Sequence, residues 1–100
     1  ENYKVIRFDL PGFGLTGPHP RNKYTIDKYA DFINEFLEVL SIDPCVIVGN
    51  SLGGWLSWEF ALKYPEKVTK MVLIDSAGYI NDRNFPFILI QFLLYCANNR

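Results

Sequence analysis

A serine set among glycines is the feature of this sequence whose residue types and spacing best suit covalent chemistry. Residues 49–53 read Gly-Asn-Ser-Leu-Gly, which matches the pattern G-x-S-x-G, and Gly54 follows. Glycines weaken regular structure, so a requirement other than stability should place them here. A serine on a sharp turn between a strand and a helix can attack a carbonyl carbon, provided that small neighbours keep the turn clear. The pattern therefore predicts that Ser51 is a nucleophile.

The neighbours of Ser51 fit the same chemistry. Leu52 would open the helix, where backbone N–H groups lack partners, so we expect its N–H to bind the negative charge on an attacked carbonyl oxygen. Asn50 precedes the serine, and we expect it to shape the floor of a substrate pocket. Asp75 ends a later strand-like run and is a candidate acid for orienting a catalytic histidine; the alternative is that it caps a local turn. The non-catalytic alternative for the whole segment is an ordinary strand–turn–helix connection in which Ser51 only caps the helix.

A second glycine motif precedes the first in the sequence and could indicate a different function. Residues 12–17 read GFGLTG and match the pattern G-x-G-x-x-G, which in dinucleotide sites opens a helix directly after a strand. Pro18 and Pro20 stand where that helix would begin, so we favour a loop over a nucleotide site, with Asp9 ordering the loop. His19 lies in the same loop and precedes the serine in the chain, and we expect a surface or lid-contacting role for it and not catalysis.

The elements that must position these residues alternate between strand and helix. The predicted strands cover residues 3–10, 45–48 and 70–75, and the predicted helices cover residues 26–40, 52–64 and 85–100. Such alternation favours an α/β fold, a parallel sheet with flanking helices. Thr25 is the expected N-cap of the first helix. On the second helix we expect Trp55, Trp58 and Phe60 to pack in the core.

Composition narrows the classes of partner. The 100 residues are 49% hydrophobic, which is enough for a small core. Their net charge is −1, so the excess of basic residues typical of a nucleic-acid-binding protein is missing. The longest apolar run, residues 85–96, is too short to span a membrane, and no signal peptide is predicted, so we expect a cytoplasmic location. Cys45 and Cys96 show no metal-binding spacing, and reduced thiols are favoured over a disulfide. We expect neither a metal nor an organic cofactor; the oligomeric state is left open.

As a set, these motifs resemble the α/β-hydrolase superfamily. Residues 5–16 (VIRFDLPGFGLT) are similar to the strand and D-x-x-G-x-G-x-S/T loop of that family, and residues 45–78 are similar to its nucleophile elbow, the following helix and the next strand. The resemblance implies an excerpt of an α/β-hydrolase fold, a single partial domain over residues 1–100. Core strands and helices would occupy residues 1–80, and residues 81–100 would begin a cap or lid.

The resemblance also implies parts that these residues do not hold. An oxyanion loop would precede the first strand, and a triad histidine would lie far downstream of Ser51. A further strand would lie between those at residues 3–10 and 45–48, so we expect a gap in the sheet and exposed edges. Without the histidine, we expect the fragment alone to be inactive.

The function that follows is that of a serine hydrolase, which cleaves a carboxylic ester or related apolar carbonyl substrate through an acyl-enzyme on Ser51. A serine at this position argues against haloalkane dehalogenases and epoxide hydrolases, which form an ester on a carboxylate nucleophile. Two alternatives remain: a hydrolase of carbon–carbon bonds in diketone-type substrates, and a non-catalytic ligand-binding protein on the same scaffold. The binding protein differs from both hydrolases by whether a histidine and an acid reach Ser51 in the complete chain.

Overall fold

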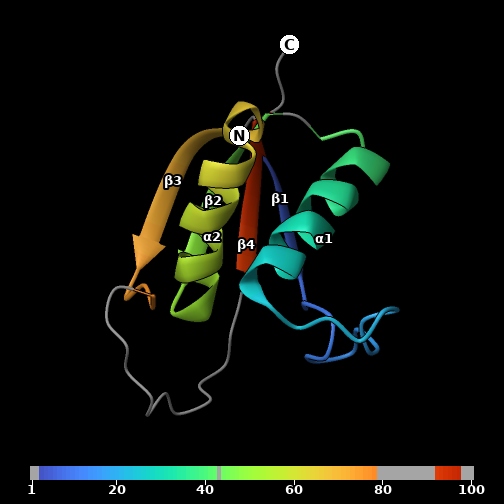
Figure 1. Ribbon diagram of the computed structural model, residues 1–100. Coiled ribbons are helices and arrows are strands. Elements are labelled where there is room, and N and C mark those ends of the chain that lie inside the picture. The colour runs from blue at the N-terminus through green and yellow to red at the C-terminus, as the bar shows by residue number, and fades with distance from the viewer. Residues whose placement is uncertain (1–2, 43, 79–91, 98–100) are drawn as a thin grey trace.

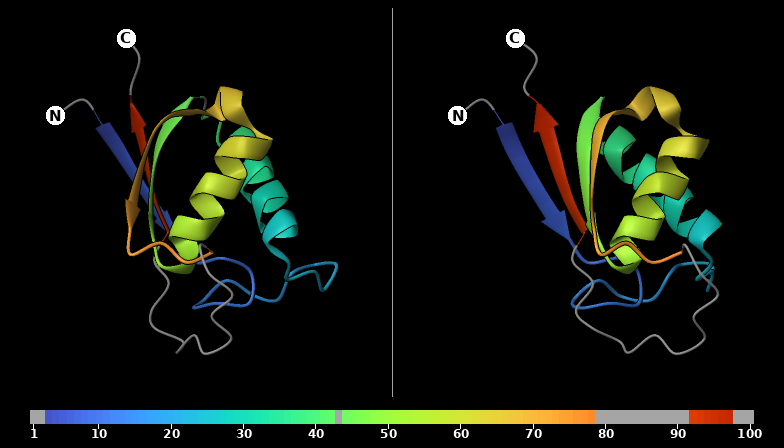
Figure 2. Two further views of the ribbon diagram at one scale, coloured as in Figure 1. Left: turned by 60° about the vertical axis from the view of Figure 1, so that its left-hand side comes forward. Right: turned by 90° about the vertical axis from the view of Figure 1, so that its left-hand side faces the viewer.

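The computed structural model describes residues 3–42, 44–78 and 92–97, the last of these by their backbone. Four strands form one sheet, in the order β1 (Tyr3–Phe8), β4 (Phe92–Ala97), β2 (Cys45–Asn50) and β3 (Val68–Ile74). Two α-helices of the described part, α1 (Ile26–Val39) and α2 (Leu52–Lys63), lie on the same face of this sheet (Figures 1 and 2). A short 3₁₀ turn, η1 (Pro65–Lys67), leads from α2 into β3.

Strand directions confirm the predicted α/β architecture. Strands β2 and β3 pair in parallel, with Val48 opposite Val72 and Asn50 opposite Ile74. Strand β4 is antiparallel to both β1 and β2, so β1, β2 and β3 all run the same way. The carboxyl ends of β2 and β3 therefore meet at one edge of the sheet, where parallel α/β folds gather their functional residues.

The prediction for the last segment is wrong in part. A helix was expected over residues 85–100, but Phe92–Ala97 form β4, which fills the expected gap between β1 and β2. The segment lacks a clear 3.6-residue period, and a place between two strands offers backbone hydrogen bonds on both of its sides. Residues 79–91 and 98–100 lie outside the described residues, so for residues 81–91 and 98–100 the expected cap stays a prediction.

The core lies between the two helices and the sheet. Fully buried side chains come from both helices and the central strand β2: Ile33, Leu37, Ile47, Leu56 and Phe60. Helix α1 begins as predicted, because the Thr25 hydroxyl accepts a hydrogen bond from the Lys28 N–H at 3.3 Å. Burial at this helical spacing fixes the face that α1 turns toward α2 and the sheet.

The described residues were also compared with the requirements of a membrane span and of a metal site. Within the described ranges, no helix is long and apolar enough to cross a membrane. Nor does any group of three His, Cys, Asp or Glu side chains in those ranges gather as metal ligands do. Cys45 is a buried thiol, and its Sγ donates to the carbonyl oxygen of Lys67 at 3.4 Å.

Candidate active site

Ser51 occupies a strained backbone conformation between β2 and α2. Its φ of 56° and ψ of −118° lie in a region that non-glycine residues seldom adopt. Such conformations cost of order 1–3 kcal/mol and persist where the surrounding structure enforces them, most often at functional sites. The sharp strand-to-helix turn predicted at residue 51 is therefore present, and the side chain on it is half-buried, neither sealed in the core nor fully exposed.

The serine does not act as a helix cap. Ser51 holds the N-cap position of α2, yet its hydroxyl makes no capping hydrogen bond to that helix. Serine is favoured at N-caps because its side chain usually satisfies an orphan backbone N–H there. The Ser51 side chain therefore does not stabilise α2 in the way that an N-cap serine usually does.

Backbone hydrogen bonds hold the turn from both sides. The N–H of Ser51 donates to the carbonyl oxygen of Ile74 at 3.0 Å, and the N–H of Ala77 donates to the carbonyl oxygen of Ser51 at 2.9 Å. The same Ser51 carbonyl also accepts from Gly54 (3.0 Å) and Trp55 (3.2 Å) in the first turn of α2. The end of β3, the loop after it and the start of α2 thus all fix the turn.

Close packing explains two of the glycines. A Cβ at Gly49 would collide with the carbonyl oxygen of Gly53 and with the Oγ of Ser57, which already donates to that carbonyl at 2.6 Å. A Cβ at Gly54 would lie 2.7 Å from the Cβ of Ser76, in the loop after β3. The first turn of α2 can approach β2 and this loop only because both positions lack side chains.

The structure brings the predicted residues to one edge of the sheet. Leu52 is the first residue of α2, so its N–H belongs to the set without partners inside the helix. Asp75 directly follows β3 with a φ of 43°, is exposed, and lies between Ile74 and Ala77, both of which bond to the Ser51 backbone. Asn50 ends β2 and is exposed.

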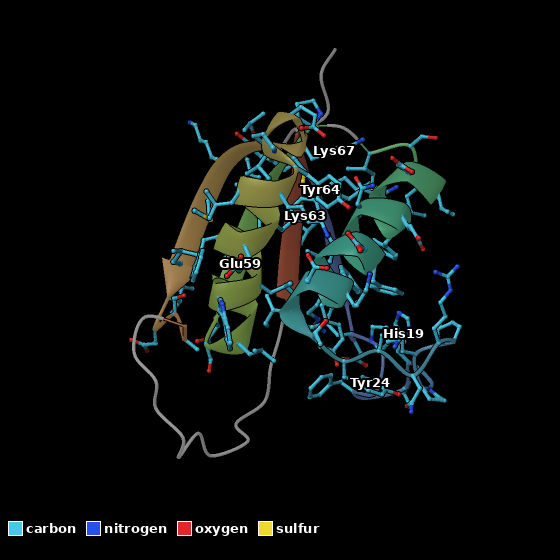
Figure 3. The ribbon with its side chains drawn as sticks, viewed as in Figure 1. His19, Tyr24, Glu59, Lys63, Tyr64 and Lys67 are labelled. Carbon is cyan, nitrogen blue, oxygen red and sulfur yellow. The ribbon has the colours of Figure 1, made fainter. Side chains whose placement is uncertain are left out.

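His19 belongs to a different part of the molecule. Figure 3 shows it in the loop before α1, away from α2 and close to Tyr24. Its Nδ1 accepts hydrogen bonds from the backbone N–H groups of Arg21 (3.1 Å) and Lys23 (3.4 Å), and the backbone N–H of His19 donates to the Tyr24 hydroxyl at 3.0 Å. The imidazole therefore organises its own loop.

The loop with the second glycine motif is also explained by its own contacts. The Asp9 carboxylate accepts from the Leu15 N–H at 3.2 Å, as predicted for a residue that orders this loop. A Cβ at Gly14, whose φ is 51°, would strike that carboxylate. No helix opens after these glycines, because α1 begins only at Ile26. The geometry of a dinucleotide-binding turn is thus missing from this described loop.

A pocket of about 670 Å³ lies beside the start of α2. Its walls come from the loop after β1, the region around the start of α1, and the first turn of α2: Gly12, Phe13, Tyr24, Thr25, Ile26, Tyr29, Leu52 and Trp55. Leu52 adjoins Ser51, so the pocket lies next to the strained turn. Asn50 is not among the residues that line it.

Sequence reasoning missed this pocket. Trp55 was expected to pack in the core, but it is half-buried and lines the pocket, whereas Phe60 is fully buried as expected. The signal available in the sequence was the concentration of aromatic residues in segments next to the glycine motifs. Periodicity did not reveal it, because Phe13 and Tyr24 lie outside any helix.

A charged network joins the two helices. The Lys63 ammonium contacts the α1 carboxylates of Asp27 (2.7 Å) and Asp31 (2.6 Å), and the Tyr64 hydroxyl donates to Asp31 at 2.6 Å. Figure 3 shows Lys63 and Tyr64 on the side of α2 that faces α1. The hydrogen bonds from Lys63 and then Tyr64 lower the pKa of Asp31 below its ordinary 3.8. The hydrogen bond to Asp31 raises the pKa of Tyr64 to about 12.

Acid should weaken this contact between the helices. A carboxyl group whose pKa falls on folding contributes stability above its unfolded pKa and loses it as the pH drops through its folded pKa. We expect Asp31→Asn to lower the free energy of unfolding by about 1 kcal/mol at pH 7, and the difference from the parent protein to shrink at a pH well below 3.8, as Asp31 becomes protonated. Urea unfolding at both pH values measures it. Glu35→Gln removes an exposed carboxylate from the same helix; a loss of equal size and pH dependence in that control would contradict the assignment.

Comparison with known proteins places this geometry in a family. The model of the α/β hydrolase fold family matches residues 1–95. The chain is 37% identical over 89 residues to the Bacillus subtilis protein named uncharacterized hydrolase YugF, covering 89% of this chain and 32% of that protein. It is 36% identical over 74 residues to epoxide hydrolase 4 of Homo sapiens, covering 73% of this chain and 20% of that protein.

A third relative is the 2-hydroxy-6-oxo-2,4-heptadienoate hydrolase of Pseudomonas putida, 35% identical over 75 residues. The match covers 75% of this chain and 27% of that protein. The chain thus spans between a fifth and a third of the length of these three relatives. With a family model matched over nearly its whole length, and with the strand–turn–helix at Ser51 in place, this chain belongs to the α/β hydrolase fold family.

Proposed function

We propose that the protein containing this chain is a serine hydrolase that cleaves a carboxylic ester or related carbonyl compound through an acyl-enzyme on Ser51. The observation that carries the proposal is the conformation of Ser51: a strained φ of 56° at a helix N-cap, with a hydroxyl that does not cap the helix. Membership of the α/β hydrolase fold family and relatives named as hydrolases support it.

The proposed reaction has two steps. The Ser51 oxygen bonds to the carbonyl carbon, its proton passes to a base, and the bond to the leaving alcohol breaks as that alcohol takes up the proton. Water then attacks the acyl-serine and releases the acid. The Leu52 N–H and the N-terminal field of α2 stabilise the oxyanion in both steps, an effect of roughly 10²- to 10³-fold in rate per donor in serine hydrolases.

The remaining members of the triad are also proposals. The base is a histidine that the family resemblance implies lies beyond these 100 residues. Asp75 is the candidate acid, since it follows β3 at the edge that holds Ser51, and the backbone bonds of Ile74 and Ala77 tie its segment to the turn. Epoxide hydrolysis, as considered above, would need a carboxylate nucleophile at position 51, and this chain has a serine there. The activity in the name of the human relative is therefore not carried over to this protein.

Hydrolysis of a diketone-type substrate is the second candidate. It is favoured by the identity of 35% to the relative named 2-hydroxy-6-oxo-2,4-heptadienoate hydrolase. The same Ser51 and Leu52 would serve, because that reaction also begins with attack on a carbonyl group. A ligand-binding protein without catalysis is the third.

A fluorophosphonate probe separates enzyme from binding protein. Such a probe phosphonylates serines that are activated by a base, so we expect the complete protein to be labelled and Ser51→Ala to be unlabelled. Ser57→Ala is the matched control, because Ser57 is buried, donates to Gly53 and should not react. Absence of labelling in folded protein would favour the binding protein.

A further inference from the structure

The pocket beside Ser51 has walls of a distinctive chemistry. Half of its lining residues are aromatic, namely Phe13, Tyr24, Tyr29 and Trp55, and none of the others carries a charge. A volume of about 670 Å³ lies within the range of sites that bind small molecules, roughly 300–1,000 Å³. We propose that this pocket binds a flat, uncharged ring of the substrate, and that Trp55 determines the preference for it. The inference rests on the proposed function, because it assigns that ring to the substrate of Ser51.

The polar atoms of these aromatic side chains are already engaged. The Tyr29 hydroxyl donates to the carbonyl oxygen of Pro11 at 3.0 Å, and the Tyr24 hydroxyl accepts from the backbone N–H of His19 at 3.0 Å. The Trp55 Nε1 donates to the Glu59 carboxylate at 3.3 Å. Rings held in this way present apolar surface to the pocket, which suits an apolar ring better than a polar or charged group.

The rings already pack as aromatic pairs do. Tyr24 and Tyr29 lie with ring centroids 6.4 Å apart and planes at 58°, and Phe13 and Tyr29 lie 6.3 Å apart at 45°. Tilted pairs at such distances are the arrangement that aromatic rings prefer. A ring from the substrate would extend this cluster, whereas a flexible alkyl chain would gain only the burial.

Two of the rings that line the pocket pack against glycine backbone. A Cβ at Gly12, whose φ is 85°, would lie 3.0 Å from the Tyr24 ring, and a Cβ at Gly78 would lie 2.5 Å from the Trp55 ring. The backbone therefore lies directly against both rings and limits their movement. Trp55 is also one turn beyond the nucleophile, with its backbone N–H on the Ser51 carbonyl at 3.2 Å, and Leu52, which adjoins Ser51, lines the same pocket.

Two esters of the same alcohol test the preference in the complete protein. Hydrolysis of ethyl phenylacetate and ethyl hexanoate is followed by acid release, and the ratio of their kcat/KM values is compared between variants. We expect the parent protein to favour phenylacetate and Trp55→Leu to lower the ratio by about fivefold to tenfold, the size of one aromatic pair. Trp58→Leu is the matched control on the same helix, outside the pocket lining, and should leave the ratio unchanged. An unchanged ratio in Trp55→Leu, or an equal loss in both variants, would overturn the inference.

A binding experiment separates this inference from the proposed function. Ser51→Ala removes the hydroxyl but leaves the pocket lining, so calorimetric titration with the same two esters reports recognition without catalysis. We expect tighter binding of ethyl phenylacetate, weakened by Trp55→Leu in the same background. That result supports ring recognition even if the parent protein fails to hydrolyse esters. Equal affinity for both esters would overturn ring recognition even if Ser51 proves to be the nucleophile.

Discussion

Replacing Ser51 by alanine should abolish almost all hydrolysis and leave the protein folded. In serine hydrolases the loss of the nucleophile alone lowers kcat by roughly 10⁶-fold, because base and acid have no hydroxyl left to activate. Alanine keeps a Cβ at the strained φ of 56°, so the backbone hydrogen bonds that hold the turn should be retained. Steady-state kinetics on ethyl phenylacetate, with the folded fraction checked by urea unfolding, measures both effects.

Ser51→Gly adds a test of the strain itself. Glycine adopts positive φ without a steric cost, so this variant should be equally inactive but about 1 kcal/mol more stable than Ser51→Ala. A parent protein that gives up stability to hold a side chain in this position would be consistent with a functional site. Equal stability of the two variants, or substantial activity in either, would count against the proposed role of the turn.

Replacing Gly49 by alanine should destabilise the protein by about 3 kcal/mol, the upper range for overpacking a tight contact. The added methyl would strike the Gly53 carbonyl and the Ser57 hydroxyl, and the first of these is backbone that cannot rotate away. The start of α2 would have to move away from β2, which displaces the Leu52 N–H from Ser51. The free energy of unfolding, measured with urea, and kcat should therefore both fall.

Gly17→Ala is the matched control for that substitution. A Cβ at Gly17 meets nothing within 4 Å, so the change in the free energy of unfolding should stay within about 0.5 kcal/mol. If both variants were equally stable, the close approach of α2 to β2 would not be the reason for the glycine at position 49.

The position of the strained turn could be anticipated because the sequence signals for it are local. A run of apolar strand residues, a serine between glycines and a helical period after them specify a strand–turn–helix, and Ser51 adopts the conformation this requires. Thr25 was likewise placed by its own hydroxyl and the first turn of α1. The predicted start of the third strand was wrong by two residues. Strand β3 begins at Val68 and not at residue 70, because pairing with Cys45 extends it.

The features that the sequence did not reveal depend on tertiary partners. The strand conformation of Phe92–Ala97 follows from pairing with β1 and β2, which no local pattern in that segment encodes. The pocket likewise joins Phe13 and Tyr24, from loops, to Trp55 on a helix more than thirty positions away. The apolar pattern of α2 assigned Trp55 to the core, and only the spatial arrangement distinguishes it from Phe60.

Mapping the site of fluorophosphonate modification tests the central claim most directly. The complete protein is treated with the probe, digested, and analysed by mass spectrometry for the modified peptide. The proposal predicts one phosphonyl group per chain, carried by the oxygen of Ser51. Modification of a different serine, or none at all in protein shown to be folded, would contradict it.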